Sequence, residues 1–201
     1  MLRVALTGGI ATGKSYVLDR FRGLGAACLE ADHLAHGVMA AGTEATQAIA
    51  TRFGMEMLDA QGAVDRRRLA PVVFADAAAR RDLEAIVHPA VRRAIEIALR
   101  ALVRTGEPAV AIVEVPLLYE VGRAGDFDRV IATVCPPALQ LARLAARGLS
   151  EAEARQRLAA QMPADEKGRQ ADCVIRTDGS FADTDRQVDE IWAKLTIGWR
   201  P

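Results

Sequence analysis

One short segment near the N-terminus restricts the possible folds of this chain more than any other feature. The segment matches the pattern GxxxxGK[ST] and consists of Gly8, Gly9, Ile10, Ala11, Thr12, Gly13, Lys14 and Ser15. An apolar run at 3–7 precedes it, and apolar residues at helical spacing follow within 14–24. We therefore expect a strand, a tight loop and a helix, with the loop N–H groups turned toward bound phosphates.

Two side chains at the end of this segment suit a nucleoside triphosphate. Lys14 is expected to reach the β- and γ-phosphates, and the Ser15 hydroxyl is expected to ligate Mg²⁺. The pattern predicts triphosphate binding, and it does not by itself choose between a kinase, an ATPase and a GTPase.

The rest of the chain favours an α/β fold with a parallel sheet. A second short strand is expected at 26–29, and further strands at 109–115, 129–134 and 173–175. Residues 33–88 show no strong strand pattern and predict a helical insert. Pro89 suits the first position of a helix to about residue 104, followed by a turn at 106–108.

Asp32 is the first acidic candidate for catalysis. It follows the second predicted strand, so we expect it in the same crevice of the sheet as the phosphate loop. There it could accept the proton of an attacking hydroxyl or help to hold Mg²⁺, although a helix cap or a loop acid fits the position equally well. For Glu30, two residues earlier, solvent exposure is the better-supported interpretation.

Composition and scattered residues exclude several classes of protein. The 26 basic and 26 acidic residues leave no overall basic field, which argues against nucleic acid as a partner. No apolar run is long enough for a membrane span, so we expect a cytoplasmic protein. The sequence indicates no obligate protein partner. Cys28, Cys135 and Cys173 lack disulfide or zinc spacing, and His33 and His36 lack a third metal ligand.

A helix expected at 137–147 carries two arginines one turn apart. Arg143 and Arg147 would share a helix face and could close over phosphates, neutralising charge and excluding water. A solvated helix face explains either arginine equally well when it is taken singly. Ser150 and Glu153 predict a capping box for the next helix, which would reach about residue 161.

An ordered set of further elements resembles the dephospho-coenzyme A kinase family over essentially the whole chain. Besides the phosphate loop, the set comprises Glu30-Ala31-Asp32-His33-Leu34-Ala35, Asp65-Arg66-Arg67-Arg68-Leu69 with Val73-Phe74, Ile86-Val87-His88-Pro89, Val115-Pro116-Leu117-Leu118, Gln140, Arg143, Arg147, Arg157, Gln161, Lys167 and Ala171-Asp172.

The resemblance implies a P-loop kinase core with a parallel sheet, a helical substrate insert and a helical lid. The core would take residues 1–32, 89–138 and 166–201, the substrate-binding domain 33–88 and the lid 139–165. The implied reaction uses ATP with Mg²⁺ to phosphorylate the ribose 3′-hydroxyl of dephospho-coenzyme A, the last step of coenzyme A biosynthesis.

The resemblance also implies roles for individual residues. Catalysis would depend on Asp32, Lys14 and Arg143. ATP would be bound by residues 8–15 together with Tyr16 and Arg147. The acceptor would be bound by Asp32, His88, Pro116, Leu117 and Leu118, and Mg²⁺ by Ser15 with Asp32 as a second candidate ligand. For His88 the residues alone favour a structural or substrate-positioning role before Pro89.

Three positions depart from the family pattern. Glu30 stands where aspartate is usual, Tyr16 where threonine commonly follows the loop, and Thr177 where asparagine is often found. The last departure puts an adenine contact there in doubt, and Tyr16 can offer the α-phosphate only its backbone N–H.

Two other functions remain open at this point. One is a different small-acceptor P-loop kinase, of the nucleoside or shikimate type. The other is a nucleotide-dependent switch or ATPase, for which Glu114 at the end of an apolar run is the best feature. A guanine-specific Asn-Lys-x-Asp motif is absent from the sequence, which argues against a GTPase switch.

Overall fold

The chain divides by its internal contacts into two compact units. The computed structural model describes residues 1–106 and 108–197. A sheet unit comprises Met1–Leu29 with Leu102–Pro201, and a helical unit comprises Glu30–Ala101. This division does not test the predicted boundaries of the core, the substrate domain and the lid, which stay predictions. The turn expected at 106–108 includes Glu107, and the core segment 166–201 ends in 198–201; these positions lie outside the described residues.

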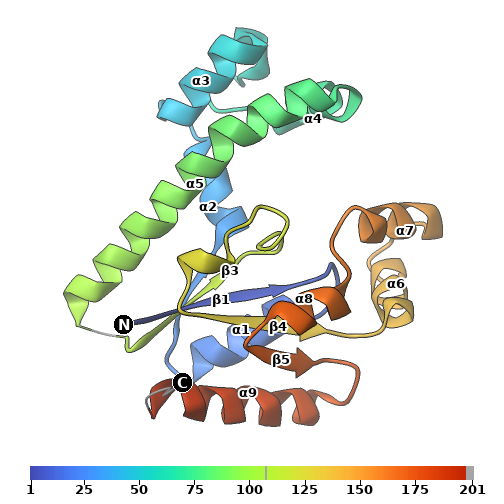
Figure 1. Ribbon diagram of the computed structural model, residues 1–201. Helices are drawn as coiled ribbons and strands as arrows, with labels where there is room; N and C mark the ends of the chain where they lie inside the picture. Colours follow the sequence, from blue (N-terminus) through green and yellow to red (C-terminus); the bar gives the residue numbers. More distant parts are fainter. Residues whose placement is uncertain (107, 198–201) are drawn as a thin grey trace. The chain divides into compact units, whose positions relative to one another are not determined.

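A five-stranded sheet with the order β2-β3-β1-β4-β5 confirms the α/β fold class (Figure 1). Its strands are β1 (Leu2–Gly8), β2 (Ala27–Glu30), β3 (Val110–Glu114), β4 (Arg129–Val134) and β5 (Cys173–Arg176). β1 pairs in parallel with β3 and β4, and β4 pairs in parallel with β5. The middle strands are apolar at nearly every position because both faces of the sheet are covered by other elements.

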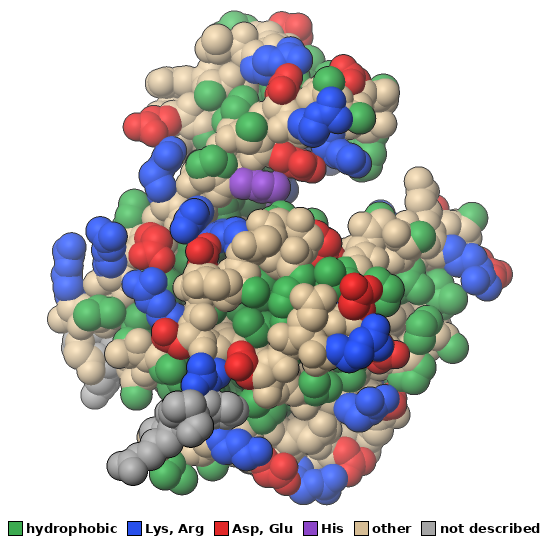
Figure 2. All heavy atoms as spheres, in the orientation of Figure 1, with side chains coloured by type: hydrophobic (Ala, Val, Ile, Leu, Met, Phe, Trp, Pro, Cys, Tyr) green, Lys and Arg blue, Asp and Glu red, His purple; other side chains and the backbone are tan. Residues whose placement is uncertain are grey.

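Helices surround this sheet within the same unit. They are α1 (Lys14–Gly23), α6 (Pro137–Ala145), α7 (Glu151–Ala159), α8 (Ala164–Gln170) and α9 (Phe181–Thr196), with a 3₁₀ turn η2 (Ala124–Asp126). Phe21 of α1 and Val188 of α9 belong to one buried cluster with the central strands. The charged face of α9 alternates between basic and acidic side chains at the bottom of Figure 2.

Some of the expected element boundaries hold, and others are wrong. Gly25 follows α1 with a φ of 101°, as a glycine that ends a helix should, and Ser150 and Glu153 form the predicted capping box. α6 ends at Ala145, two residues before the expected end. α9 begins at Phe181, because Ser180 and Asp183 form a second capping box that sets the helix start.

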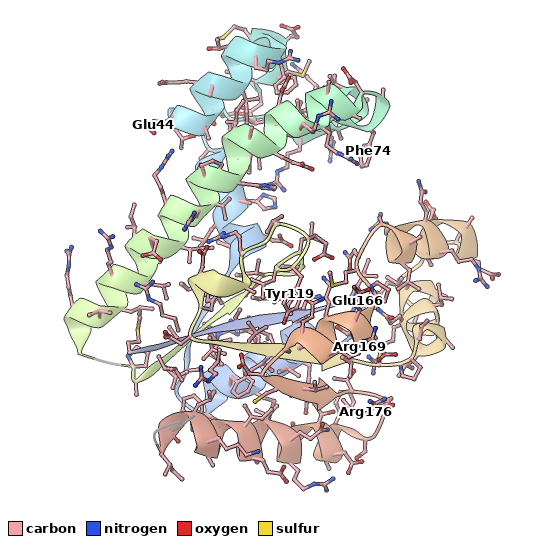
Figure 3. The ribbon with its side chains drawn as sticks, viewed as in Figure 1. Glu44, Phe74, Tyr119, Glu166, Arg169 and Arg176 are labelled. Atoms are coloured by element: carbon pink, nitrogen blue, oxygen red, sulfur yellow. The ribbon has the colours of Figure 1, made fainter. Side chains whose placement is uncertain are left out.

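The helical unit has the helical character that its sequence predicts. Its elements are α2 (Ala31–Val38), α3 (Glu44–Phe53), the 3₁₀ turn η1 (Met55–Met57), α4 (Arg66–Ala75) and α5 (Ala77–Thr105), which runs on into the sheet unit. Met39, Ile49, Val64 and Leu69 form its buried centre. Phe74, in contrast, is 89% exposed near the end of α4 (Figure 3).

The expected helix start at Pro89 is wrong, because Pro89 lies inside the long helix α5. A proline within a helix removes one backbone hydrogen bond and crowds the preceding turn. Packing on both sides offsets that cost, since Ile86 and Val87 join the buried centre of the unit and Ala90 and Val91 are themselves buried. Among the described residues, no helix has the length and apolar character needed to cross a membrane.

A buried lysine joins α8 to the segment after β3. Lys167 is fully buried, and its Nζ donates to the backbone oxygen of Pro116 at 2.6 Å and pairs with Glu120 at 2.8 Å. Glu120 also accepts a hydrogen bond from the N–H of Met162, at 3.0 Å. These contacts fix the position of residues 116–120 against α8.

We predict that Lys167→Met lowers the free energy of unfolding by about 2–4 kcal/mol, because it leaves the Glu120 carboxylate and the Pro116 carbonyl without their buried donor. Urea denaturation measures the change. Arg169→Met is the matched control, since Arg169 is exposed on the same helix (Figure 3). Equal stability of Lys167→Met and the wild type would contradict the prediction.

Candidate functional site

The predicted phosphate loop connects the end of β1 to the start of α1. Gly8 has a φ of 150° and Gly13 a φ of 86°, so both adopt backbone conformations that side chains disfavour. Ala11 also has a positive φ, 59°, which is uncommon for a residue with a side chain. The loop is therefore held in a shape that an isolated peptide of this sequence would not prefer.

Side chains from distant elements hold three successive carbonyls of this loop. Gln140 donates to the oxygen of Ile10 at 2.6 Å, and Arg143 donates to the oxygen of Ala11 at 3.1 Å. The Thr177 hydroxyl donates to the oxygen of Thr12 at 2.8 Å. In a trans peptide the C=O and the following N–H point in opposite directions, so fixing these oxygens fixes the N–H groups of residues 11–13 as well.

The start of the loop is closed to side chains. A Cβ on Gly8 would lie 2.3 Å from the hydroxyl of Thr133 and 2.6 Å from its backbone oxygen. The Thr12 hydroxyl, itself fully buried, lies 2.6 Å from the Thr133 hydroxyl and donates to the oxygen of Gly9 at 2.8 Å. This small hydrogen-bonded cluster fixes the loop against β4.

The N-terminus of α1 suits an anion. Gly13 caps it without a side chain, and its first turn contains no acidic residue, so neither a cap nor a carboxylate competes for the N–H groups. Lys14 Nζ contacts the oxygens of Gly9 and Gly8, at 3.1 and 3.3 Å, which places the ammonium group over the loop. Ser15 is exposed in the same turn and presents a hydroxyl oxygen, a ligand type that suits Mg²⁺.

A pocket of about 470 Å³ adjoins the loop. It is lined by Ala11, Gly13, Tyr16, Arg143, Arg147, Thr177, Gly179, Ser180, Phe181 and Thr184. The rings of Tyr16 and Phe181 lie 4.9 Å apart at its wall, and Phe181 is 71% exposed. An aromatic surface beside a phosphate site gives a flat base a place to stack.

Tyr16, one of the departures from the family pattern, takes part in a hydrogen bond of its own. Its hydroxyl donates to Asp185 at 2.7 Å, and this bond raises the pKa of the Tyr16 phenol above its ordinary value. Asp185 also pairs with Arg20 at 2.9 Å. The Tyr16 ring is therefore held at the pocket wall by contacts on both its face and its hydroxyl.

The two arginines expected to share a helix face differ in their surroundings. Arg143 donates to Ala11 and, through both of its terminal nitrogens, to the hydroxyl and backbone oxygen of Thr177. Arg147 lies in the turn after α6 and lines the pocket. Burial raises the pKa of the nearby Cys135 thiol, with Arg143 opposing the shift, so the thiol stays protonated at neutral pH.

The residues expected to bind the acceptor belong to both units. Asp32 is exposed in the first turn of α2, where its carboxylate interacts favourably with the positive end of the helix dipole. His88 is exposed on α5. In the sheet unit Leu117 is 41% exposed, whereas Leu118 is fully buried. The oxygen of Pro116 accepts hydrogen bonds from Lys167 and from the Thr7 hydroxyl.

Several residues that matter to the loop were not predicted as site residues from the sequence. Gln140 and Gln161 both contact Ile10, the first as a donor to its oxygen and the second as an acceptor from its N–H at 2.9 Å. In the sequence Thr177 stands out only as a departure from the family pattern. In the structure its hydroxyl donates a hydrogen bond to the loop and accepts one from Arg143. Among the described residues, no group of three or more His, Cys, Asp or Glu could hold a metal ion.

We predict that Gly8→Ala abolishes nucleotide binding and destabilises the fold by several kcal/mol, because the new methyl group would overlap the backbone of Thr133. Gly23→Ala is the matched control. Gly23 is helical with open space around it, so the alanine should stabilise the protein by up to about 1 kcal/mol. Calorimetric titration with ATP and urea denaturation measure both effects, and normal ATP binding by Gly8→Ala would contradict the loop geometry.

Comparisons with known proteins agree on one family. A family model described as "Dephospho-CoA kinase" (CoaE) matches residues 2–183. A dephospho-CoA kinase of Geobacter sulfurreducens is 44% identical over 192 residues, covering 95% of this chain and 97% of that protein.

Two solved structures resemble this one over almost their whole length. TT1252 from Thermus thermophilus has a TM-score of 0.77 at 33% identity, covering 97% of this chain and 98% of that one. A dephospho-CoA kinase from Campylobacter jejuni has a TM-score of 0.74 at 28% identity, covering 98% of each chain.

Proposed function

The chain belongs to the dephospho-coenzyme A kinase family, and from that premise we propose that it transfers the γ-phosphate of ATP to the ribose 3′-hydroxyl of dephospho-coenzyme A. The products are coenzyme A and ADP, and the reaction is the final step of coenzyme A synthesis. The observation that best supports the donor half of this proposal is the anchoring of the loop carbonyls at Ile10, Ala11 and Thr12, which keeps the loop N–H groups ready for phosphates.

The loop and α1 would bind the triphosphate of ATP. The N–H groups at the start of α1 and the ammonium of Lys14 supply positive potential where charge accumulates on the transferring phosphoryl group. We assign the base of ATP to the pocket beside Tyr16 and Phe181, and Arg147 to the nucleotide within that pocket. Arg143 would act as a positioning residue that holds the loop.

Ser15 is the residue that we propose as a magnesium ligand, with Asp32 as a second candidate. The hydroxyl of Ser15 is exposed at the start of α1, and together with phosphate oxygens it makes the all-oxygen ligand set that Mg²⁺ prefers. When bound, Mg²⁺ would offset charge on the β- and γ-phosphate oxygens.

Asp32 is the residue that we propose to receive the proton of the acceptor hydroxyl. Its carboxylate is exposed in the first turn of α2, and the helix N-terminus favours the charged form that can accept a proton. Transfer requires the attacking 3′-oxygen, the γ-phosphorus and the oxygen that bridges the β- and γ-phosphates to lie in line. As the new P–O bond forms, the bond from the γ-phosphorus to the bridging oxygen breaks, ADP leaves, and the hydroxyl proton passes to Asp32. The roles of His88 and of residues 116–118 in acceptor binding, and the cytoplasmic location, remain predictions.

An acceptor panel tests the function directly. We expect purified protein with Mg-ATP to release ADP rapidly with dephospho-coenzyme A and slowly with shikimate, with nucleosides or without acceptor. ADP released at the same rate without any acceptor would support an ATPase instead. Rapid release only with another acceptor would identify a different kinase.

We predict that Lys14→Ala lowers kcat/KM by two to three orders of magnitude, which corresponds to about 3–4 kcal/mol of lost transition-state stabilisation. Steady-state kinetics with varied ATP measure the loss. Lys194→Ala is the control, because Lys194 is an exposed lysine on α9 and its loss should leave the rate unchanged. An unchanged kcat/KM in Lys14→Ala would remove the lysine from the mechanism.

We predict that Asp32→Asn lowers kcat by about a hundredfold or more while ATP binds normally, because the amide cannot accept the hydroxyl proton. Glu30→Gln removes an exposed carboxylate two residues earlier and should keep nearly full activity. Single-turnover kinetics and ATP titration separate the chemical step from binding. Near-normal turnover by Asp32→Asn would show that this carboxylate is not the proton acceptor.

A further inference from the structure

Arg66 differs from the other arginines of the helical unit in its partner. Five of these form ion pairs with carboxylates: Arg52 with Asp82, Arg68 with Asp65, Arg80 with Glu84, Arg93 with Glu44 and Arg100 with Glu96. The Nη1 atom of Arg66 instead lies 2.7 Å from Nε2 of His36. Among the residues that the structure describes, no carboxylate pairs with Arg66, so its charge is not compensated.

The contact with His36 orients the guanidinium group without neutralising it. A guanidinium has only N–H donors, so Nε2 of His36 must be the acceptor. Because Arg66 is exposed, its remaining N–H donors are open to an anion from solvent.

The backbone around Arg66 is fixed from two directions. Asp65 caps α4 by accepting from the N–H groups of Arg67 and Arg68, at 2.9 and 3.4 Å. The side chain of Arg68 then donates to the oxygens of Glu56 and Leu58, which secures the start of α4 to η1. Figure 2 shows several basic side chains gathered over the end of this unit that holds α4 and η1.

A second link connects this helix start to α2. The N–H of Val64 donates to the oxygen of Met39 at 3.1 Å, just beyond the last residue of α2, and both side chains belong to the buried centre of the unit. The pairing of Arg66 with His36 is therefore built on a rigid framework of backbone and core contacts.

The same face of α2 carries Asp32. His36 follows Asp32 by four residues, so the two side chains are neighbours about one helical turn, or about 5.4 Å, apart along the axis. Asp32 thus lies one turn before a histidine whose ring contacts the guanidinium of Arg66.

We propose that Arg66, held by His36, binds the diphosphate of the acceptor. This inference rests on the proposed function, because it takes the 3′-hydroxyl of dephospho-coenzyme A to lie at Asp32. The 5′-diphosphate is attached to the same ribose, only a few bonds from that hydroxyl, and must lie a short distance from Asp32. A guanidinium is the side chain best suited to two phosphate oxygens, and that of Arg66 contacts His36, which lies one helical turn after Asp32.

The first experiment compares Arg66→Gln with Arg67→Gln in steady-state kinetics. Arg67 is the matched control, because it is the next exposed arginine of the same helix. We expect Arg66→Gln to raise the KM for dephospho-coenzyme A by about tenfold to a hundredfold, with the KM for ATP unchanged, and Arg67→Gln to raise it less than about threefold. Adenosine, which has the ribose and the base but no phosphate, should inhibit the wild type and Arg66→Gln with equal inhibition constants.

The second experiment changes the charge at His36 while Arg66 stays in place. His36→Gln supplies a neutral amide oxygen near the position of Nε2 that can accept the hydrogen bond, and we expect a KM for dephospho-coenzyme A within about threefold of the wild type. His36→Glu supplies a carboxylate of the same size as the glutamine amide, which would neutralise Arg66 and repel phosphate. It should raise that KM by about tenfold or more.

The outcomes separate this inference from the proposed function. If the wild type does not phosphorylate dephospho-coenzyme A, the proposed function fails and the inference fails with it. If the wild type is active, the inference alone is overturned by any of three results. These are an unchanged KM in Arg66→Gln or His36→Glu, a rise in KM in Arg67→Gln equal to that in Arg66→Gln, or a rise in the adenosine inhibition constant of Arg66→Gln that matches its rise in KM.

Discussion

The nucleotide site depends on the hydrogen bonds that hold the backbone oxygens of residues 10–12. The side chains of Gln140, Arg143 and Thr177 each donate a hydrogen bond to one of these three oxygens. Because the following N–H points the opposite way, these bonds keep the N–H groups of the loop, and not its carbonyls, available to phosphate. The arrangement also maintains the positive φ of Ala11, because Arg143 donates to the oxygen of that residue. Phosphate binding in this protein is thus a property of the sheet unit and not of the loop sequence alone.

The side chains that we propose as sources of positive charge for the two substrates belong to different units of the chain. Lys14 and Ser15, with the pocket beside Tyr16, belong to the sheet unit, whereas Asp32 and Arg66 belong to the helical unit. We propose that the N-terminus of α1 and Lys14 supply positive charge to the triphosphate of ATP, and that Arg66 supplies it to the diphosphate of the acceptor. This division lets the affinities for the two substrates be changed by separate substitutions.

The sequence predicted the features that depend on local pattern. The loop at 8–15, the individual strands of the sheet and the capping box at Ser150 are each indicated by residues close together in the chain, and the structure contains them. The anchors of the loop could not be predicted in this way. Gln140 lies 130 residues from Ile10, and Thr177 lies 165 residues from Thr12, so no spacing rule connects them. Pro89 was misplaced for a related reason, because packing on both sides of α5 overrides a local preference.

The central claim is that this chain adds a phosphate from ATP to the ribose 3′-hydroxyl of dephospho-coenzyme A. Phosphorus NMR of the product tests it most directly, with the wild-type protein, Mg-ATP and dephospho-coenzyme A. The account predicts one new phosphomonoester signal, coupled to the proton on the 3′ carbon of the ribose, in an amount equal to the ADP formed. Inorganic phosphate in place of that signal, or a phosphomonoester on any other carbon, would contradict it.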